Sequence, residues 1–149
     1  MATNIYIKQM GQEDFAQGLA LVWRVFLAYE APDYTKEGVA EFYKSIHDQG
    51  YLSNLSMYGA YDKDELVGVI ATRNDGAHIA LFFVEGSHHR QGIGKQLFQR
   101  VKDQCRHDKM TVNSSPYAVG VYHRLGFVDT DREQVEKGVK FTPMELILP

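Results

Sequence analysis

The chain has 149 residues, of which 44% are hydrophobic and 23% are charged, a mixture typical of globular proteins. This length predicts a single domain over residues 1–149, which can bury a core without a disulfide or a metal ion. Sixteen Lys and Arg against nineteen Asp and Glu leave a net charge of −3, which argues against a nucleic-acid partner. With one cysteine, no apolar signal core and no run long enough for a membrane helix, we expect a cytoplasmic protein without a membrane partner.

The first half of the chain predicts two helices between short strands. Apolar residues at helical spacing from Phe15 to Phe26 predict the first helix, and the second follows an N-cap at Thr35 and stops near Gly50. Residues 77–84 are apolar on both alternating faces, which predicts a central strand covered on each side. The other strands expected in this half cover residues 4–9, 58–61 and 66–72, the last two as a hairpin.

The second half predicts two more helices alternating with strands. Apolar residues recur at every fourth position from Ile93 to Cys105, which predicts the third helix and places Cys105 in the core. Ser115 as N-cap, with Pro116 at the first helical position, begins the fourth helix, and Gly126 ends it. The remaining strands cover residues 110–113, 127–130 and 139–148, the last with Pro143 at an edge or a bulge. The order βααβββαβαββ predicts a mixed α/β sandwich.

The loop from Val84 to Lys95 is the most informative segment, because it leads from an apolar strand through glycines into a helix. Glycine lets backbone come close to a ligand, and the first turn of a helix offers N–H groups and the positive end of the helix dipole. Together these features predict an anion site, most naturally for phosphate. A dinucleotide fingerprint starting at Gly92 fails because position 97 is not glycine. A P-loop ending at Gly94-Lys95 fails because position 89 is not glycine and position 96 is neither Ser nor Thr.

A third pattern fits the residues of this loop. The run His89-Arg90-Gln91-Gly92-Ile93-Gly94 resembles the coenzyme A signature of the GNAT superfamily of acetyl-CoA-dependent N-acetyltransferases, with His89 where Gln or Arg is usual. A second family pattern follows, with Asn113 after the next strand and then Ala118, Tyr122 and Gly126-Phe127 at the expected spacing. The resemblance implies the GNAT-like acyl-CoA N-acyltransferase fold, in which about four helices flank a central, mostly antiparallel sheet.

The same resemblance implies acetyl-CoA as cosubstrate and direct transfer of its acetyl group to a primary amine through a tetrahedral intermediate. A backbone N–H near Phe83-Val84, where a bulge splays the sheet, would stabilise the oxyanion, and the pantetheine arm would pair with this strand. The positions implied to bind the coenzyme are Phe83, Val84, His89, Arg90, Gln91, Gly92, Ile93, Gly94, Lys95, Asn113 and Tyr122.

Tyr122 matches the position of the family's general acid, because a phenol is protonated at neutral pH and can donate to a leaving thiolate. The same tyrosine also suits plain core packing. For the base, His78 stands where some family members carry a glutamate; Glu85 and water alone are the alternatives. Asn113 suits a hydrogen bond to coenzyme A or acceptor, or a simple turn. In the resembled fold, the connection over the acceptor cleft corresponds to the segment that contains Tyr29, Glu30, Asp33 and Tyr34. Carboxylates and aromatic rings there would bind a cationic amine, but a solvated loop explains these residues equally well.

The rival interpretation is a non-catalytic acyl-CoA-binding or regulatory module on the same fold. No metal site is expected, because the neighbouring His88 and His89 point apart and no further ligand follows at metal spacing. Residues 139–148 offer an edge for a homodimer. The identity of the amine, the preferred acyl chain, the base and the oligomeric state stay open at this stage.

Overall fold

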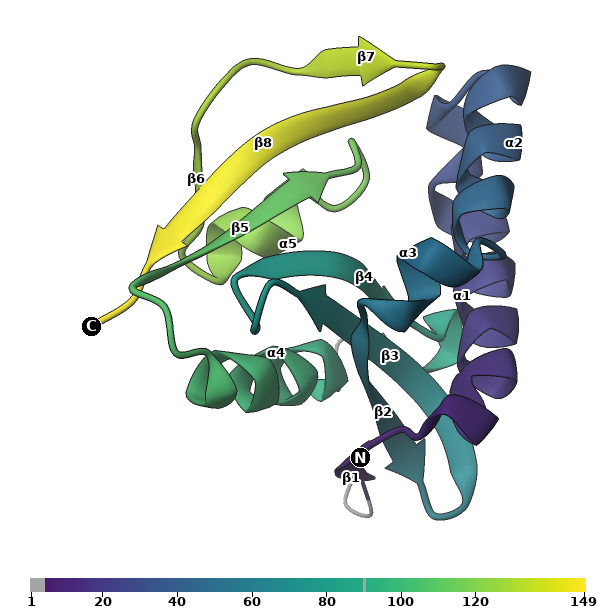
Figure 1. Cartoon of the computed structure of the whole chain (residues 1–149), viewed down its shortest axis with the longest axis vertical. Helices are drawn as coiled ribbons and strands as arrows, with labels where there is room; N and C mark the ends of the chain where they lie inside the picture. Colours follow the sequence, from purple (N-terminus) through teal and green to yellow (C-terminus); the bar gives the residue numbers. More distant parts are fainter. Residues whose placement is uncertain (1–4, 90) are drawn as a thin grey trace.

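The structure is a computed structural model that describes residues 5–89 and 91–149. Its centre is an 8-stranded sheet with the order β1-β2-β3-β4-β5-β8-β6, and β7 pairs with β8 (Figure 1). The strands are β1 (Ile5–Gln9), β2 (Ser56–Asp62), β3 (Glu65–Arg73), β4 (His78–Val84), β5 (Lys109–Ser114), β6 (Val128–Asp129), β7 (Gln134–Glu136) and β8 (Val139–Ile147). Only β4 and β5 pair in parallel among the described strands, which confirms the mostly antiparallel sheet.

The helices are α1 (Phe15–Tyr29), α2 (Lys36–Ser45), α3 (Gln49–Ser53), α4 (Ile93–Gln104) and α5 (Val119–Arg124). Thr35 caps α2 as predicted, since its side chain accepts a hydrogen bond from the Gly38 N–H at 3.1 Å. The second predicted helix is divided, because Asp48 caps a new short helix, α3, by accepting from the Tyr51 N–H at 3.0 Å. None of the helices in residues 5–89 and 91–149 is long and apolar enough to cross a membrane.

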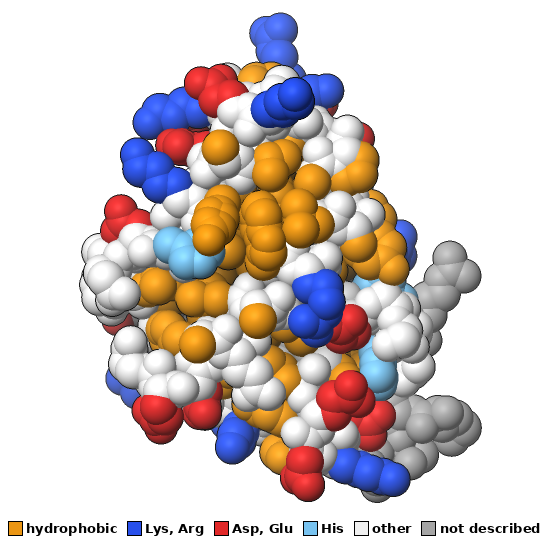
Figure 2. All heavy atoms as spheres, turned by 90° about the vertical axis from the view of Figure 1, so that its right-hand side faces the viewer, with side chains coloured by type: hydrophobic (Ala, Val, Ile, Leu, Met, Phe, Trp, Pro, Cys, Tyr) orange, Lys and Arg blue, Asp and Glu red, His pale blue; other side chains and the backbone are white. Residues whose placement is uncertain are grey.

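Two hydrophobic cores cover the two faces of the sheet. One packs α1 against β2 to β4 around Phe26 and Leu81, and the other packs α4 and α5 around Leu97 and Phe127. The strand β4 contributes to both, which confirms it as a central strand covered on each side. Cys105 is half-buried at the edge of the second core. Figure 2 shows that further hydrophobic side chains gather on the outer face of the molecule that carries α1 and α2.

One local prediction is wrong, and another holds on one side of a strand only. Ser115 caps a turn rather than α5: the Ala118 N–H donates to its Oγ at 3.3 Å, and the helix begins only at Val119. Pro143 pairs in regular register with Asn113 of β5, but on its other side it falls in the gap between the partners of β6 and those of β7, so it stands at a local edge within β8. Its carbonyl accepts from the Thr130 N–H at 2.9 Å, just past the last residue of β6. The proline therefore stands where this ladder ends, and its missing N–H disrupts little.

The sheet opens between β4 and β5. These strands pair only at His78 with Thr111 and at Ile79 with Val112, and then diverge. The bulge that accompanies this opening is at Ala80, because the register to β3 shifts between Ile79 and Leu81. The bulge was expected near Phe83-Val84 and thus lies earlier in the strand. Beyond Ala80, no described strand pairs with the side of β4 that faces β5, so backbone groups of a central strand border open space.

Candidate active site

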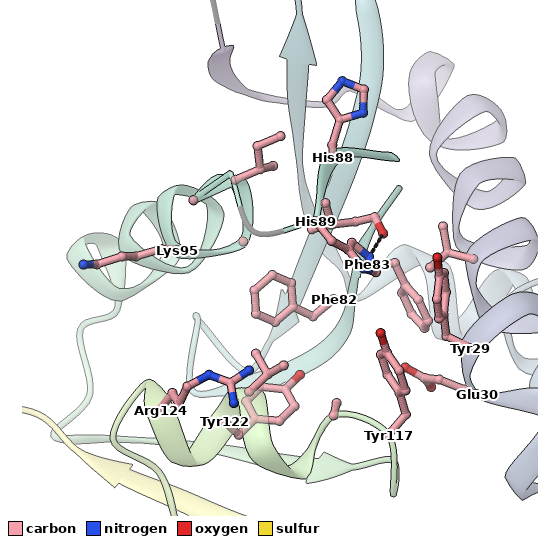
Figure 3. A pocket seen from close by; sticks show the side chains of 17 residues that line it. Tyr29, Glu30, Phe82, Phe83, His88, His89, Lys95, Tyr117, Tyr122 and Arg124 are labelled. Atoms are coloured by element: carbon pink, nitrogen blue, oxygen red, sulfur yellow. Dashed lines mark hydrogen bonds between the residues drawn. The ribbon is translucent and has the colours of Figure 1, made fainter. Parts of the chain in front are cut away.

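A hollow of about 410 Å³ lies where β4 and β5 diverge, and we call it the first hollow. Its walls come from the end of α1, from β4, from the loop that follows β4, from the start of α4 and from α5 (Figure 3). The labelled side chains that line it are Tyr29, Glu30, Phe82, Phe83, His88, His89, Lys95, Tyr117, Tyr122 and Arg124. The first hollow therefore brings together segments from the beginning, the middle and the end of the chain.

Gly92 forms the entrance to α4. It has φ +80°, a left-handed conformation that favours glycine, and a Cβ built on it would meet nothing within 4 Å. The Gln96 N–H bonds to the Gly92 carbonyl at 3.0 Å, so α4 begins here. The N–H groups of a first helical turn lack partners within the helix, and this turn borders the open space of the hollow. Phosphate fits such a place by size, charge and hydrogen bonding.

His89 supports the end of β4. Its Nε2–H donates to the carbonyl of Val84 at 2.7 Å, and its ring lies 5.0 Å, centroid to centroid, from that of Tyr29 (Figure 3). Only Nδ1 is left to face a ligand. His89, which stands where Gln or Arg is usual in the signature, thus lines the first hollow, but one of its two ring nitrogens is bonded to the backbone.

The cationic side chains of the first hollow are Lys95 and Arg124, as far as the described residues go. Arg124 was not predicted, because it is an exposed residue of α5 and only the fold brings it next to the start of α4. Gln91 does not line this hollow: it is exposed, and its side chain donates to the Ser87 carbonyl at 3.4 Å. Arg90, also expected at the coenzyme site, lies outside the described residues.

Tyr122 projects from α5 and is only 5% exposed. Its ring packs edge to face on Phe127, with centroids 5.4 Å apart, and lies 6.0 Å from the ring of Phe82. Burial raises the pKa of this phenol, and the nearby charge of Glu30 raises it further. The hydroxyl therefore keeps its proton across the neutral range and is able to donate it or a hydrogen bond.

A second hollow of about 200 Å³ adjoins the first. The two share the side chains that stand between them, namely Glu30, Phe82, Phe83, Ala118 and Tyr122. Its remaining walls include Tyr34, Glu41, Phe42, Tyr51, Asn113 and Ser115. Asn113 lines this second hollow and not the first, and the roles of Glu41, Tyr51 and Ser115 were not foreseen because no sequence motif contains them.

The two side chains considered as the base lie away from both hollows. His78 Nδ1 is 2.8 Å from Thr111 Oγ1, and burial together with Arg73 lowers the pKa of its imidazole to about 4. Glu85 is paired with Arg24 of α1. Neither lines a hollow, so the structure does not bring either of them together with Tyr122. The carboxyl group that does lie beside Tyr122 is Glu30.

The paired histidines point in different directions. His88 Nε2 lies 3.2 Å from Asp62 Oδ2, whereas His89 turns to the Val84 carbonyl. Across residues 5–89 and 91–149, no cluster of three His, Cys, Asp or Glu side chains could hold a metal ion.

Residues 30–148 match the acetyltransferase (GNAT) domain family, and the chain therefore belongs to this family of acetyltransferases. Solved structures agree on the fold. The GCN5-related N-acetyltransferase of Rhodopseudomonas palustris superimposes with a TM-score of 0.84 at 18% identity, covering 98% of this chain and 97% of that one.

Two further solved structures share the fold, one of them a complex with coenzyme A and the other an N-acyl amino acid synthase. The PaiA N-acetyltransferase of Thermoplasma acidophilum, in complex with coenzyme A, gives a TM-score of 0.75 at 16% identity and covers 96% of this chain and 98% of its own. FeeM, an N-acyl amino acid synthase from uncultured soil microbes, gives 0.73 at 14% identity, covering 97% and 91%. The predicted GNAT fold is thereby confirmed.

Proposed function

We propose that this protein transfers the acetyl group of acetyl-CoA to a primary amine by direct attack of the amine on the thioester. The first hollow is the observation that carries this proposal. It has an open backbone cradle at Gly92 for the pyrophosphate, and the phenol of Tyr122 for the reacting end. Between them, the unpaired edge of β4 beyond Ala80 suits an extended arm that adds to a sheet, such as pantetheine.

The reaction needs an oxyanion donor and a proton for the leaving sulfur. The backbone N–H of Val84 is the candidate for the first task, because Val84 lines the first hollow and its N–H points away from β3, toward which the next N–H, that of Glu85, donates. Tyr122 is the candidate for the second. Burial raises the pKa of its phenol, and the same dry surroundings raise the proton affinity of a thiolate released next to it.

Thermal unfolding with and without acetyl-CoA tests the binding step first. Binding to the native state at 100 times the dissociation constant stabilises by about 2.7 kcal/mol, which gives a measurable rise in Tm. Release of free thiol on addition of an amine then tests the transfer. Binding without thiol release from any amine would favour the non-catalytic acyl-CoA module instead.

Replacement of one hydroxyl tests the role of the acid. We expect Tyr122→Phe to lower kcat about 100-fold, because general acid catalysis typically contributes that much, while the dissociation constant of coenzyme A changes little. The matched control is Tyr43→Phe, which removes a hydroxyl from an exposed tyrosine on α2. If Tyr122→Phe turned over as fast as the wild type, Tyr122 would have no catalytic role and would serve only in core packing.

A further inference from the structure

Glu30 stands where the two hollows meet. It directly follows α1, with its backbone N–H donating to the Phe26 carbonyl at 2.9 Å, and its side chain points into the first hollow (Figure 3). The polar groups near its carboxyl include Asp33 and Tyr34 from the turn after α1, Ser115 from the loop before α5, and Tyr122 from α5. Tyr117 lines the first hollow beside it (Figure 3). Among the described residues, no Lys, Arg or His forms an ion pair with it. Its charge is therefore available to a cation that enters either hollow.

The protonation of Glu30 is poised near neutrality. Burial raises the pKa of its carboxyl group from 4.5 to about 7; a hydrogen bond with Ser115 opposes this rise and the charge of Asp33 adds to it. A carboxyl group with such a pKa exists in both forms near pH 7, which is the condition under which a base exchanges protons most effectively.

The charges of the second hollow restrict what it can hold. Its other carboxylate, Glu41, has Oε1 at 3.4 Å from Nζ of Lys137 and is already compensated. No Lys or Arg lines this hollow in the part of the chain that the structure describes. Its remaining walls are mainly aromatic and aliphatic, with Tyr34, Phe42, Tyr51 and Leu81 among them. One uncompensated carboxylate therefore faces an apolar cavity.

From this arrangement we infer that Glu30 takes the proton of the acceptor ammonium, and that the second hollow receives a primary amine with one positive charge and an apolar body. The inference rests on the proposed acetyl transfer and specifies its acceptor. An amino acid would bring a carboxylate for which no described lining residue offers a cation. A diamine would bring a second ammonium, and the other carboxylate among the described residues that line this hollow, Glu41, is already paired. Aromatic walls suit a flat, apolar body, and the face of an aromatic ring also attracts a cation.

The protons balance as follows. One proton of the ammonium passes to the carboxylate of Glu30, which frees the lone pair of the nitrogen, and that proton moves from Glu30 to water after the products have formed. The nitrogen forms its bond to the acetyl carbon, the carbon–sulfur bond breaks, and its electron pair leaves on sulfur. Tyr122 gives its proton to that sulfur and regains one from the second N–H of the amine. The products are the amide, the free thiol and one proton in solution.

Kinetics of thiol release with three probe amines test the inference: 2-phenylethylamine as the single cation with an apolar body, putrescine as a diamine and glycine as an amino acid. The variants are Glu30→Gln and, as the matched control, Glu37→Gln, which makes the same change on the exposed side of α2. In the wild type we expect the largest kcat/KM for 2-phenylethylamine. Its kcat/KM should rise with pH around pH 7, and this rising limb of the pH profile lies well below the pKa of the amine itself.

Glu30→Gln should lower kcat/KM about 100-fold and remove that limb, while its dissociation constant for acetyl-CoA stays as in the wild type. A merely structural role would lower activity but leave the limb in place, and that result overturns the inference. A larger kcat/KM for putrescine or glycine also overturns it. Failure of the proposed function looks different, because the wild type would then show neither a thermal shift with acetyl-CoA nor thiol release from any probe.

Discussion

The two hollows that meet at Glu30 and Tyr122 are built from different chemical groups. The first has the backbone of Gly92 and the cations Lys95 and Arg124 in its walls, whereas no described Lys or Arg lines the second. A polyanion with a long flexible arm suits the first, and an apolar cation suits the second. The divergence of β4 from β5 therefore does more than make room, because it places a hollow with cations beside a hollow without them and leaves the two in contact through shared side chains.

The strongest test of this contrast changes the cradle of the first hollow alone. A methyl group at position 92 meets nothing in the protein, so in Gly92→Ala it occupies the space of the ligand and also strains a backbone at φ +80°. Loss of one charge-assisted hydrogen bond, about 1.5–3 kcal/mol, corresponds to acetyl-CoA binding weaker by about tenfold or more. Calorimetric titration measures this. Gly126→Ala is the matched control, since Gly126 has φ +106° and lies outside both hollows; it should lose stability and keep its affinity.

A smaller effect, confined to the second hollow, follows from the contact between α2 and the turn from β7 to β8. A Cβ on Gly38 would lie 2.1 Å from the carbonyl oxygen of Gly138, so Gly38→Ala must displace one backbone from the other. Such overpacking costs about 1–3 kcal/mol. We expect a lower Tm and a KM for 2-phenylethylamine raised several-fold, with acetyl-CoA affinity unchanged. In Gly11→Ala, which lies outside both hollows and where the nearest atoms are the carboxylate oxygens of the Glu13 side chain at 2.7 Å, both constants should stay the same.

The last expected effects concern stability alone and have opposite slopes with pH. Folding lowers the pKa of His78 from 6.5 to about 4, so the unfolded chain takes up the proton first and stability falls as the pH drops from about 6.5 towards 4. Folding raises the pKa of Glu30 from 4.5 to about 7, so stability falls as the pH rises through that interval. Melting curves of His78→Gln should lack the first loss and those of Glu30→Gln the second. Identical curves for all three proteins would contradict both shifts.

The parts of the molecule that sequence could predict are those encoded locally. Helical spacing identified α1, α2 and α4, and the glycine pattern after β4 predicted the turn that leads into α4, because each depends on neighbouring residues. The short elements α3 and β7 contain too few residues to show a helical or strand spacing of apolar side chains. The position of the bulge depends on the register between β3 and β4, which no single strand reveals.

The candidate site divides along the same line. Tyr122 and Gly92 belong to contiguous patterns, and the family resemblance had placed Glu30 over the acceptor cleft. Arg124 and Glu41 reach the hollows only through the packing of helices distant in the chain. His78 was considered as a base from its place along the strand, but the opening of the sheet begins just after it, and its side chain stays at Thr111. A strand position alone says little about which side of such an opening a side chain will face.

In the proposed reaction, the proximity of Glu30 and Tyr122 links two proton transfers on different reactants. The negative charge of Glu30 helps to hold the pKa of the Tyr122 phenol high. A proton arriving on Glu30 cancels that charge and makes the phenol a stronger acid, by the reciprocity that governs any two coupled sites. The donor on the sulfur side is thus weakest while the amine is still charged and strengthens once the amine has been activated, so a single electrostatic contact sets the order of events.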